Sequence, residues 1–398
     1  MKKLLITTTT FPTNLQDNQP GFIYHLASYL QNDFQIYVLA PRAKGALENE
    51  KRGKIRIIRY AYGVFRRWET LAYGGGILEN LKRNRLNYLL IPLLMLAQLF
   101  ALHRTVKLKN IDLINAHWII PQGLVAILAR KLFKLPIRVV ITSHGGDLYG
   151  LNSPFLNRIK KWVIENADQL IVVSAAMKDY CYQYLNVDRN CSITVRSMGV
   201  DLVNTFNNKM RFAERQNVIF VGRLVEKKGL PILLRAVAIL KQKEISLKYT
   251  IVGDGPLKQD LLAQVQQLKI EDYVKFVGSK SHQQLPELLT QHQILVMPSV
   301  VSQGGDQEGL GLVAIEAMGC GCAVIASDLP AIRDVVQDGY NGLMFTVGDA
   351  HMLANKIEFL MENSKELLRL SKNGRESVIQ RFDWQSVAGD YQKYFEQY

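Results

Sequence analysis

Two acidic residues, Glu308 and Glu316, lie eight positions apart in the run EGLGLVAIEAMGCGCAVIAS. Eight positions is a little over two helical turns, so an unbroken helix would place both acids roughly on one face. The residues around them are mostly apolar or glycine, which indicates a buried face. Because a buried carboxylate requires hydrogen-bond partners, the spacing raises the question of what these two acids contact.

Basic residues and glycines follow several predicted strands. Arg223 and Lys228 come after VIFV, and they combine a planar guanidinium fork with a mobile ammonium group. The run Gly309, Leu310, Gly311 and Leu312 is predicted to open a helix, whose free amides and positive dipole end suit phosphate or sugar oxygens. Further clusters in such loops contain Gly21, the sequence His144-Gly145-Gly146-Asp147, Gly222 and Gly253. Ligands of doubly wound folds collect at the carboxyl ends of strands, so we expect these clusters to open onto one cleft.

The chain is expected to form two α/β domains, because 398 residues exceed what one hydrophobic core usually serves. Short apolar runs alternate with longer helical patterns, which is typical of parallel sheets wrapped by helices. The predicted strands are KLLITTT, QIYVLAP, KIRIIRY, DLINAH, RVVITSH, QLIVVS, SITVR, NVIFVG, KYTIVG, VKFVG, ILVMPS, CAVIAS and LMFTV. We predict two doubly wound Rossmann-like domains at 1–200 and 201–380, joined by a polar linker at 197–216. A helix at 381–398 is expected to cross back to the N-terminal domain.

The amino end MKKLLITTTT lacks the long apolar segment of a secretory signal, so we expect a cytoplasmic protein. The most apolar stretch, residues 86–102, is interrupted by Asn87, Pro92 and Gln98. We interpret it as a helix buried in the protein and not as a transmembrane segment. The four cysteines match neither a zinc site nor a C-x-x-C redox pair, so we interpret them as buried packing residues.

Positive charge is concentrated in the first half of the chain. Residues 1–200 hold 27 Lys and Arg against 12 Asp and Glu, a net charge of +15, whereas residues 201–398 hold 22 against 23, a net charge of −1. Between residues 63 and 85, basic residues alternate with Phe65, Trp68 and Tyr73. This mixture favours peripheral contact with an anionic membrane, or a lipid-phosphate acceptor. Nucleic acid is not expected as a partner, because no recognition motif is present.

These motifs resemble a known family. GRLVEKKG, VGDGP, FVG, MPS and EGLGLVAIEA occur in the order found in the retaining GT-B glycosyltransferases of family 4, and HGGD and the Gly21 loop fit the same family. The chain departs from the family at Ala323, where proline is common, and at Pro20-Gly21, where a glycine pair is common. The resemblance implies sugar transfer from a nucleotide-diphosphate donor to a saccharide or lipid-linked saccharide, in cell-envelope polysaccharide or glycolipid synthesis.

The resemblance also implies roles for individual residues. Arg223 and Lys228 would stabilise the diphosphate, Glu308 would hold donor-sugar hydroxyls, and Glu316 would accept hydrogen bonds from the ribose. His144 would lie beside the reacting sugar without acting as a general base. Backbone groups around Gly278 and Ser279 are expected to recognise the base. Because the two cations can replace a metal ion and no D-x-D motif is present, we expect no metal requirement. A UDP-sugar is expected over a GDP-sugar only as the commoner donor.

Other interpretations remain open at this stage. A solvated Glu308 and a surface Glu316 would need no ligand, although the neighbours of Glu316 are apolar. A nucleotide-sugar epimerase would share the two-domain architecture but would need no acceptor. A nucleic-acid-binding protein would explain the charge but not the acids. A Rossmann oxidoreductase is disfavoured because no G-x-G-x-x-G follows a predicted strand.

Overall fold

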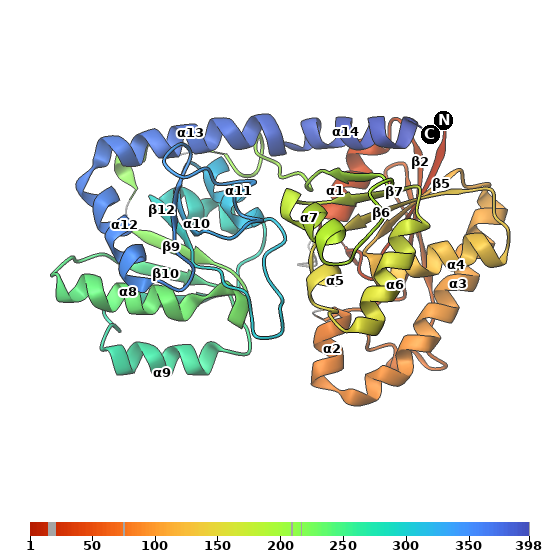
Figure 1. The fold of residues 1–398 in the computed structure, drawn as a ribbon, viewed down its shortest axis with the longest axis horizontal. Helices are drawn as coiled ribbons and strands as arrows, with labels where there is room; N and C mark the ends of the chain where they lie inside the picture. The colour runs from red at the N-terminus through yellow and green to blue at the C-terminus, as the bar shows by residue number, and fades with distance from the viewer. Residues whose placement is uncertain (15–20, 75, 208–209, 216, 398) are drawn as a thin grey trace. The chain divides into compact units, whose positions relative to one another are not determined.

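The structure is a computed structural model that describes residues 1–14, 21–74, 76–207, 210–215 and 217–397. The chain forms two compact units. The N-terminal unit comprises Met1–Val173, Met177–Met198 and Val387–Tyr398, and the C-terminal unit comprises Ser174–Ala176 and Gly199–Ser386. Each unit contains one sheet with helices packed around it (Figure 1).

The N-terminal unit is built on an eight-stranded sheet in the order β3-β4-β2-β1-β5-β6-β7-β8. Every pairing is parallel except that of β3 with β4. The central strands are buried along their length, as expected when helices cover both faces. The strands are β1 (Lys3–Thr7), β2 (Gln35–Pro41), β3 (Asn49–Arg52), β4 (Ile55–Tyr60), β5 (Leu113–His117), β6 (Arg138–Ser143), β7 (Gln169–Val172) and β8 (Ile193–Val195).

The helices of this unit connect successive strands. They are α1 (Phe22–Leu30), α2 (Ile77–Arg83), α3 (Leu90–Lys109), α4 (Leu124–Leu132), α5 (Gly146–Tyr149), α6 (Pro154–Glu165) and α7 (Ala175–Gln183), with short helical turns η1 (Arg66–Trp68), η2 (Arg85–Leu89) and η3 (Ile119–Gly123). Local sequence sets the start of α6, where the Ser153 side chain accepts a hydrogen bond from Leu156 N and Pro154 occupies the first turn. Residues of α14 (Trp384–Glu396) from Val387 onward belong to the same unit.

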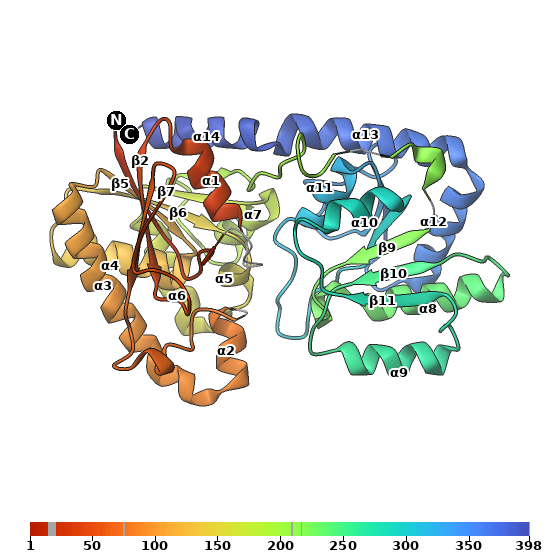
Figure 2. The same ribbon diagram turned by 180° about the vertical axis from the view of Figure 1, so that it is seen from behind.

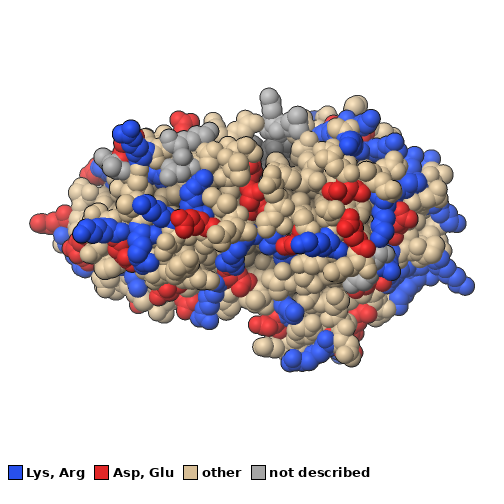
Figure 3. Space-filling view, turned by 90° about the horizontal axis from the view of Figure 1, so that it is seen from above, with Lys and Arg blue, Asp and Glu red and all other residues tan. Residues whose placement is uncertain are grey.

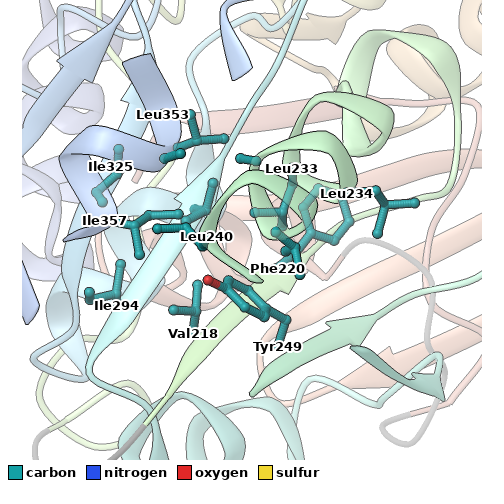
Figure 4. Close-up of a cluster of buried hydrophobic side chains, with 14 of the residues drawn as sticks. Val218, Phe220, Leu233, Leu234, Leu240, Tyr249, Ile294, Ile325, Leu353 and Ile357 are labelled. Carbon is teal, nitrogen blue, oxygen red and sulfur yellow. The ribbon is translucent and has the colours of Figure 1, made fainter. Parts of the chain in front are cut away.

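The C-terminal unit has a six-stranded, all-parallel sheet in the order β11-β10-β9-β12-β13-β14. Figure 2 shows β9, β10 and β11 of this sheet side by side. The strands are β9 (Val218–Val221), β10 (Tyr249–Val252), β11 (Val274–Gly278), β12 (Ile294–Met297), β13 (Ala323–Ser327) and β14 (Leu343–Phe345). The helices are α8 (Leu230–Gln242), α9 (Lys258–Leu268), α10 (Leu285–Gln291), α11 (Leu312–Gly319), α12 (Ala350–Glu362) and α13 (Ser364–Phe382), with the turns η4 (Phe212–Glu214) and η5 (Glu226–Lys228). Strand residues such as Val218 and Ile325 pack against Leu233 of α8 and Leu353 of α12 (Figure 4).

All thirteen predicted strands are present, and the predicted two doubly wound α/β domains are confirmed. Strand β3 was not predicted, because its sequence NEKR is polar and it lies at the exposed edge of the sheet. The segment predicted as a polar linker packs into the C-terminal unit from Gly199 onward, where Leu202 and Phe206 are completely buried.

Helix α3 is less buried than the sequence predicted. The predicted helix is present, but only one of its faces is buried, through Leu94, Gln98 and Leu102. Among the described residues, the helical segment Arg85–Lys109 is the one whose length and hydropathy would allow it to cross a membrane, and 22% of its most apolar window is buried. The Gln98 amide donates a hydrogen bond to Thr7 Oγ1 of β1, which fixes the helix to the sheet by its buried face.

Candidate functional site

Glycines allow three loops to meet at the carboxyl ends of β9, β10 and β12. Gly253 has a φ of 144°, and a Cβ there would lie 1.9 Å from the Gly222 carbonyl oxygen. Gly229 has a φ of 62°, and its Cβ would lie 1.8 Å from the Pro298 carbonyl oxygen. No side chain fits at either point, so these positions require glycine. The turn after β9 is therefore held closely against the loops that follow β10 and β12.

This packing places Lys228 beside Glu308, a pair far apart in sequence. Lys228 Nζ lies 2.6 Å from Glu308 Oε1, and their side chains are only 16% and 10% exposed. Burial alone would raise the pKa of Glu308, but the Lys228 ammonium, together with smaller effects of Lys227 and Ser299, outweighs burial and lowers that pKa below its ordinary value. Glu308 is therefore an ionised, nearly buried carboxylate. Its partner is a cation that keeps further hydrogen-bond donors for an incoming anion.

The same turn is fixed to the loop between β12 and α11 by contacts that the sequence did not reveal. Lys227 Nζ pairs with Asp306 Oδ2 at 3.1 Å, and Glu226 Oε1 accepts a hydrogen bond from Gln303 N at 2.9 Å. The Val300 amide also donates to the Lys227 carbonyl. These contacts position the residues that precede Glu308. Residues of opposite charge in GRLVEKKG and GGDQEG were the available signal, but nothing in the sequence aligns the two segments.

The expectation of one unbroken helix from Glu308 to Glu316 is wrong. Helix α11 begins at Leu312, and Gly311 directly before it has a φ of 91°, which a continuing helix does not allow. Gly309 and Leu310 therefore belong to the loop, and Glu308 precedes the helix by four residues. The prediction that this run leads into a helix N-terminus is correct, because α11 starts at its last residue.

Glu316 lies on α11 among buried apolar neighbours. Its side chain is 14% exposed, and its Oε1 lies 3.9 Å from His282 Nε2. Burial raises the pKa of Glu316 to about 8, although Lys228 opposes the shift. His282 follows the predicted base-recognition residues Gly278 and Ser279 by a few positions, so the loop after β11 reaches the same helix. Arg223 is separated from the end of β9 by Gly222 and is exposed.

The raised pKa of Glu316 predicts a pH dependence of nucleotide binding. Below pH 8 the carboxyl group is mostly protonated, and only its ionised form is a full acceptor for two ribose hydroxyls. Affinity for UDP should therefore rise with pH between 6 and 8, by up to about tenfold per unit, and level off above 8. Titration calorimetry of the wild type and Glu316→Gln measures this. The variant retains the titration of UDP itself, so an equally steep profile in both proteins would contradict the assignment.

In the N-terminal unit, His144 belongs to a cluster of rings. His144 Nε2 lies 2.9 Å from His117 Nδ1, and the two rings meet edge to edge and are nearly coplanar, with an interplanar angle of 3°. The ring of Phe22 is 4.7 Å from His144 between centroids, so the segment after Gly21 meets the HGGD turn. Burial lowers the pKa of His144 to about 3. His144 is therefore uncharged at physiological pH and can act as a hydrogen-bonding group but not as a cation.

Of the residues that position His144, the sequence singled out Asp147 as part of HGGD but not His117. His117 is completely buried at the end of β5, which pairs with β6, the strand before His144. Asp147 Oδ2 accepts a hydrogen bond from Ile119 N at 2.6 Å, and its Oδ1 accepts one from Ser143 Oγ at 2.8 Å. Histidines at the ends of two predicted strands were a usable signal for the pair.

The described residues contain no group of three or more His, Cys, Asp or Glu side chains placed to hold a metal ion. Cys181, Cys320 and Cys322 are buried free thiols and Cys191 is partly buried, consistent with packing roles.

Comparisons with known proteins match most of the chain. The family model described as Glycosyltransferase Family 4 matches residues 21–204, and that described as Glycosyl transferases group 1 matches residues 204–377. An uncharacterized glycosyltransferase of Methanocaldococcus jannaschii is 29% identical over 73% of this chain and 77% of its own. The amylovoran biosynthesis glycosyltransferase AmsK of Erwinia amylovora is 29% identical over 66% of this chain and 65% of its own.

Solved structures show the same fold. The sucrose-phosphate synthase from Thermosynechococcus elongatus has a TM-score of 0.79 and 22% identity, covering 100% of this chain and 99% of its own. Anabaena HepE in complex with UDP has a TM-score of 0.75 and 19% identity, with 100% of both chains covered. The two family models adjoin and together cover residues 21–377, and the fold agrees with them throughout. The chain therefore belongs to the GT-B glycosyltransferases of the family 4 type, and it is a transferase.

Proposed function

We propose that the protein is a retaining glycosyltransferase that moves a sugar from a UDP-sugar donor to a saccharide acceptor in the synthesis of a polysaccharide or glycolipid. The observation that carries this proposal is the Lys228–Glu308 pair within the glycine-rich turns. This pair supports the proposal because it would offer a cation to a diphosphate and, beside it, an ionised carboxylate to sugar hydroxyls. The name of AmsK supports polysaccharide synthesis, and the HepE complex supports UDP as the donor nucleotide.

In the proposed reaction, the bond between the anomeric carbon and the diphosphate oxygen breaks as the acceptor oxygen bonds to the same face of that carbon. The acceptor proton passes to the departing phosphate oxygen. Lys228 and Arg223 stabilise the charge that develops on the diphosphate, so the transfer needs no metal ion. His144 hydrogen-bonds the sugar or acceptor near this centre as a neutral group, because burial lowers its pKa to about 3.

A thermal-shift screen of nucleoside diphosphates and nucleotide sugars, with and without EDTA, tests the proposal. The donor nucleotide should raise the melting temperature most, because a ligand of the native state stabilises by RT ln(1 + [L]/Kd). UDP is expected to give the largest shift among the diphosphates, and EDTA is expected to leave it unchanged. Product formation should require an added acceptor and keep the donor's anomeric configuration. Conversion of the nucleotide sugar without an acceptor would instead favour the nucleotide-sugar epimerase.

We also infer peripheral contact with an anionic membrane through the N-terminal unit. Leu86, Leu89, Leu93, Leu96 and Phe100 are all exposed and follow the spacing of one helical face along η2 and α3. Phe65 and Trp68 are exposed as well, and the Arg67 guanidinium lies 5.5 Å from the Phe65 ring. Figure 3 shows a different face, that of α14, where basic side chains also gather at the right-hand edge, so the positive charge of the N-terminal unit extends beyond this surface. An apolar helix face beside basic residues is typical of interfacial membrane contact.

Sedimentation with acidic-lipid vesicles should be abolished when five basic residues are replaced by Ser: Arg66, Arg67, Lys82, Arg83 and Arg85. Each such residue contributes ~1 kcal/mol near an anionic surface. The attraction is screened over about 10 Å at 0.1 M salt, so added salt should release the wild type. A matched control replaces five exposed lysines of the C-terminal unit, Lys243, Lys248, Lys269, Lys275 and Lys372. Equal loss of vesicle binding in the control would show that only net charge matters, and retained binding in the first variant would contradict the assigned surface.

A further inference from the structure

The N-terminal unit contains a large apolar pocket beside His144. Its volume is about 950 Å³, and its walls include Ile77 and Leu81 of α2, Ile91 and Met95 of α3, Leu124 of α4 and Ile159 of α6. This volume is at the upper end of the range for small-molecule sites. Protein interiors leave few voids larger than a water molecule, so a pocket of this size is not a packing defect.

One end of this pocket lies at the HGGD turn. Gly146 and Asp147, which follow His144 closely in the chain, are lining residues. Trp118 also lines the pocket, and its ring centroid is 5.4 Å from that of His144. The Trp118 backbone has a φ of 76°, an uncommon conformation for a bulky residue, and hydrogen bonds from Trp118 N to Thr142 O and from Gly123 N to Trp118 O hold it. A molecule in the pocket would therefore extend from the histidine that the proposed reaction uses.

The chemistry of the walls defines the occupant. The lining residues that the structure describes include no lysine or arginine, so nothing there pairs with a phosphate. Asp147 is the acid among them, and both of its oxygens are already bonded, to Ile119 N and Ser143 Oγ. Thr9 and Thr10 supply uncharged polar groups. These walls suit hydrocarbon, and they do not suit a charged phosphate linkage.

Helix α3 connects the pocket with the exposed apolar surface. Ile91 and Met95 line the pocket, whereas Leu89, Leu93 and Leu96 from neighbouring positions are exposed. Tyr88 both lines the pocket and is exposed, so it marks a place where the pocket meets the surface. A hydrocarbon chain could therefore pass between the pocket and a membrane along apolar side chains.

We propose that the acceptor is a glycolipid whose sugar is joined to its hydrocarbon chain by an uncharged linkage, and that this pocket holds the chain. The acceptor hydroxyl then lies near His144 while the chain extends under α2 and α3. This inference rests on the proposed glycosyl transfer, and it narrows the acceptor from saccharides in general to neutral glycolipids. It also assigns acceptor binding to specific residues of the N-terminal unit.

The test compares binding of methyl, octyl and dodecyl glucoside by titration calorimetry, below their micelle-forming concentrations. Burial of a methylene increases affinity by about fourfold at most, so octyl glucoside should bind at least roughly tenfold more tightly than methyl glucoside. Leu124→Trp should remove this preference by filling the pocket. Leu132→Trp, an exposed position on the same helix, is the matched control and should keep it. If Leu124→Trp does not fold, Ile91→Trp provides the same test from α3.

Binding of UDP by each variant, measured by thermal shift, separates this inference from the proposed function. If the wild type binds UDP normally but binds the three glucosides equally well, the glycolipid proposal is overturned and the transferase proposal is not. Preference for octyl glucoside in both pocket variants would show that the chain binds elsewhere, which also overturns it. Displacement of octyl glucoside by farnesyl monophosphate and by dodecyl glucoside should also be compared. If farnesyl monophosphate is the stronger competitor, the proposal that the acceptor has an uncharged linkage is overturned. Failure of the wild type to bind any nucleotide would instead contradict the transferase proposal.

Discussion

Replacing Lys228 with Ala is expected to reduce sugar transfer by about 10²-fold or more and to weaken UDP binding, because a preorganised charge contact to the diphosphate is lost. The structure adds a second effect. Glu308 would lose the cation 2.6 Å away and become an uncompensated, nearly buried carboxylate close to the diphosphate. Leaving such a group unpaired costs about 1–3 kcal/mol of folding stability, so calorimetry of UDP binding must be accompanied by thermal unfolding.

Two further variants separate these effects. Lys228→Ala combined with Glu308→Gln should recover stability and part of the UDP affinity, but transfer should stay low. Lys227→Ala removes the neighbouring cation, which pairs with Asp306, and should affect UDP binding much less. Arg223→Ala should also weaken UDP binding. When it is combined with Lys228→Ala, the fold loss of UDP affinity should be smaller than the product of the two single losses, because both cations act on the same diphosphate. Unchanged UDP affinity in both single variants would rule out the assigned diphosphate site.

Glu308→Gln is expected to lower turnover by about 10²-fold while leaving UDP affinity unchanged or slightly higher. The carboxylate partly neutralises Lys228 in the free protein, so its removal leaves that cation fully available to the diphosphate. The loss of turnover arises because the proposed contacts to donor-sugar hydroxyls disappear. Steady-state kinetics with the nucleotide sugar and calorimetry with UDP measure the two effects separately.

Glu316→Gln provides the comparison, because its proposed partner is the ribose and it should weaken UDP binding itself. Asp306→Asn is a matched control on the loop before Glu308, since it alters the ion pair with Lys227 and not the one with Lys228. Equal UDP affinities in Glu308→Gln and Glu316→Gln, whether both normal or both impaired, would contradict the division of roles.

The sequence predicted the sheets because their strands are buried on both faces and therefore read as continuous apolar runs. Strand β12, with the sequence ILVM, is an example. Strand β3 carries no such signal, because only pairing with β4 makes its polar residues a strand. The start of α11 was misjudged for a related reason. Glycine permits both helix and left-handed backbone, and only the structure shows that Gly311 adopts a φ of 91°.

The sequence identified most of the candidate site residues, but it predicted few of the contacts between them. Lys228 and Glu308 were both identified, but their ion pair depends on Gly229 lying against Pro298, a packing relation that sequence spacing does not encode. His117 and Asp147 act through His144 and its turn, and their roles depend on burial and hydrogen bonds of neighbouring strands. The apolar pocket was not predicted, because its lining residues come from segments scattered between Thr9 and Ile159.

The assignment of Val387–Tyr398 to the N-terminal unit has a consequence for synthesis of the protein on the ribosome. Tyr391 and Phe395 are buried in that unit, and the Phe395 ring lies 6.0 Å from Phe34. Domains generally fold as their residues emerge during translation, the first one first. Here the unit that emerges first lacks part of its core until Tyr391 and Phe395 have been synthesised. Its core can therefore be completed only after the residues of the C-terminal unit up to Ser386 have been synthesised.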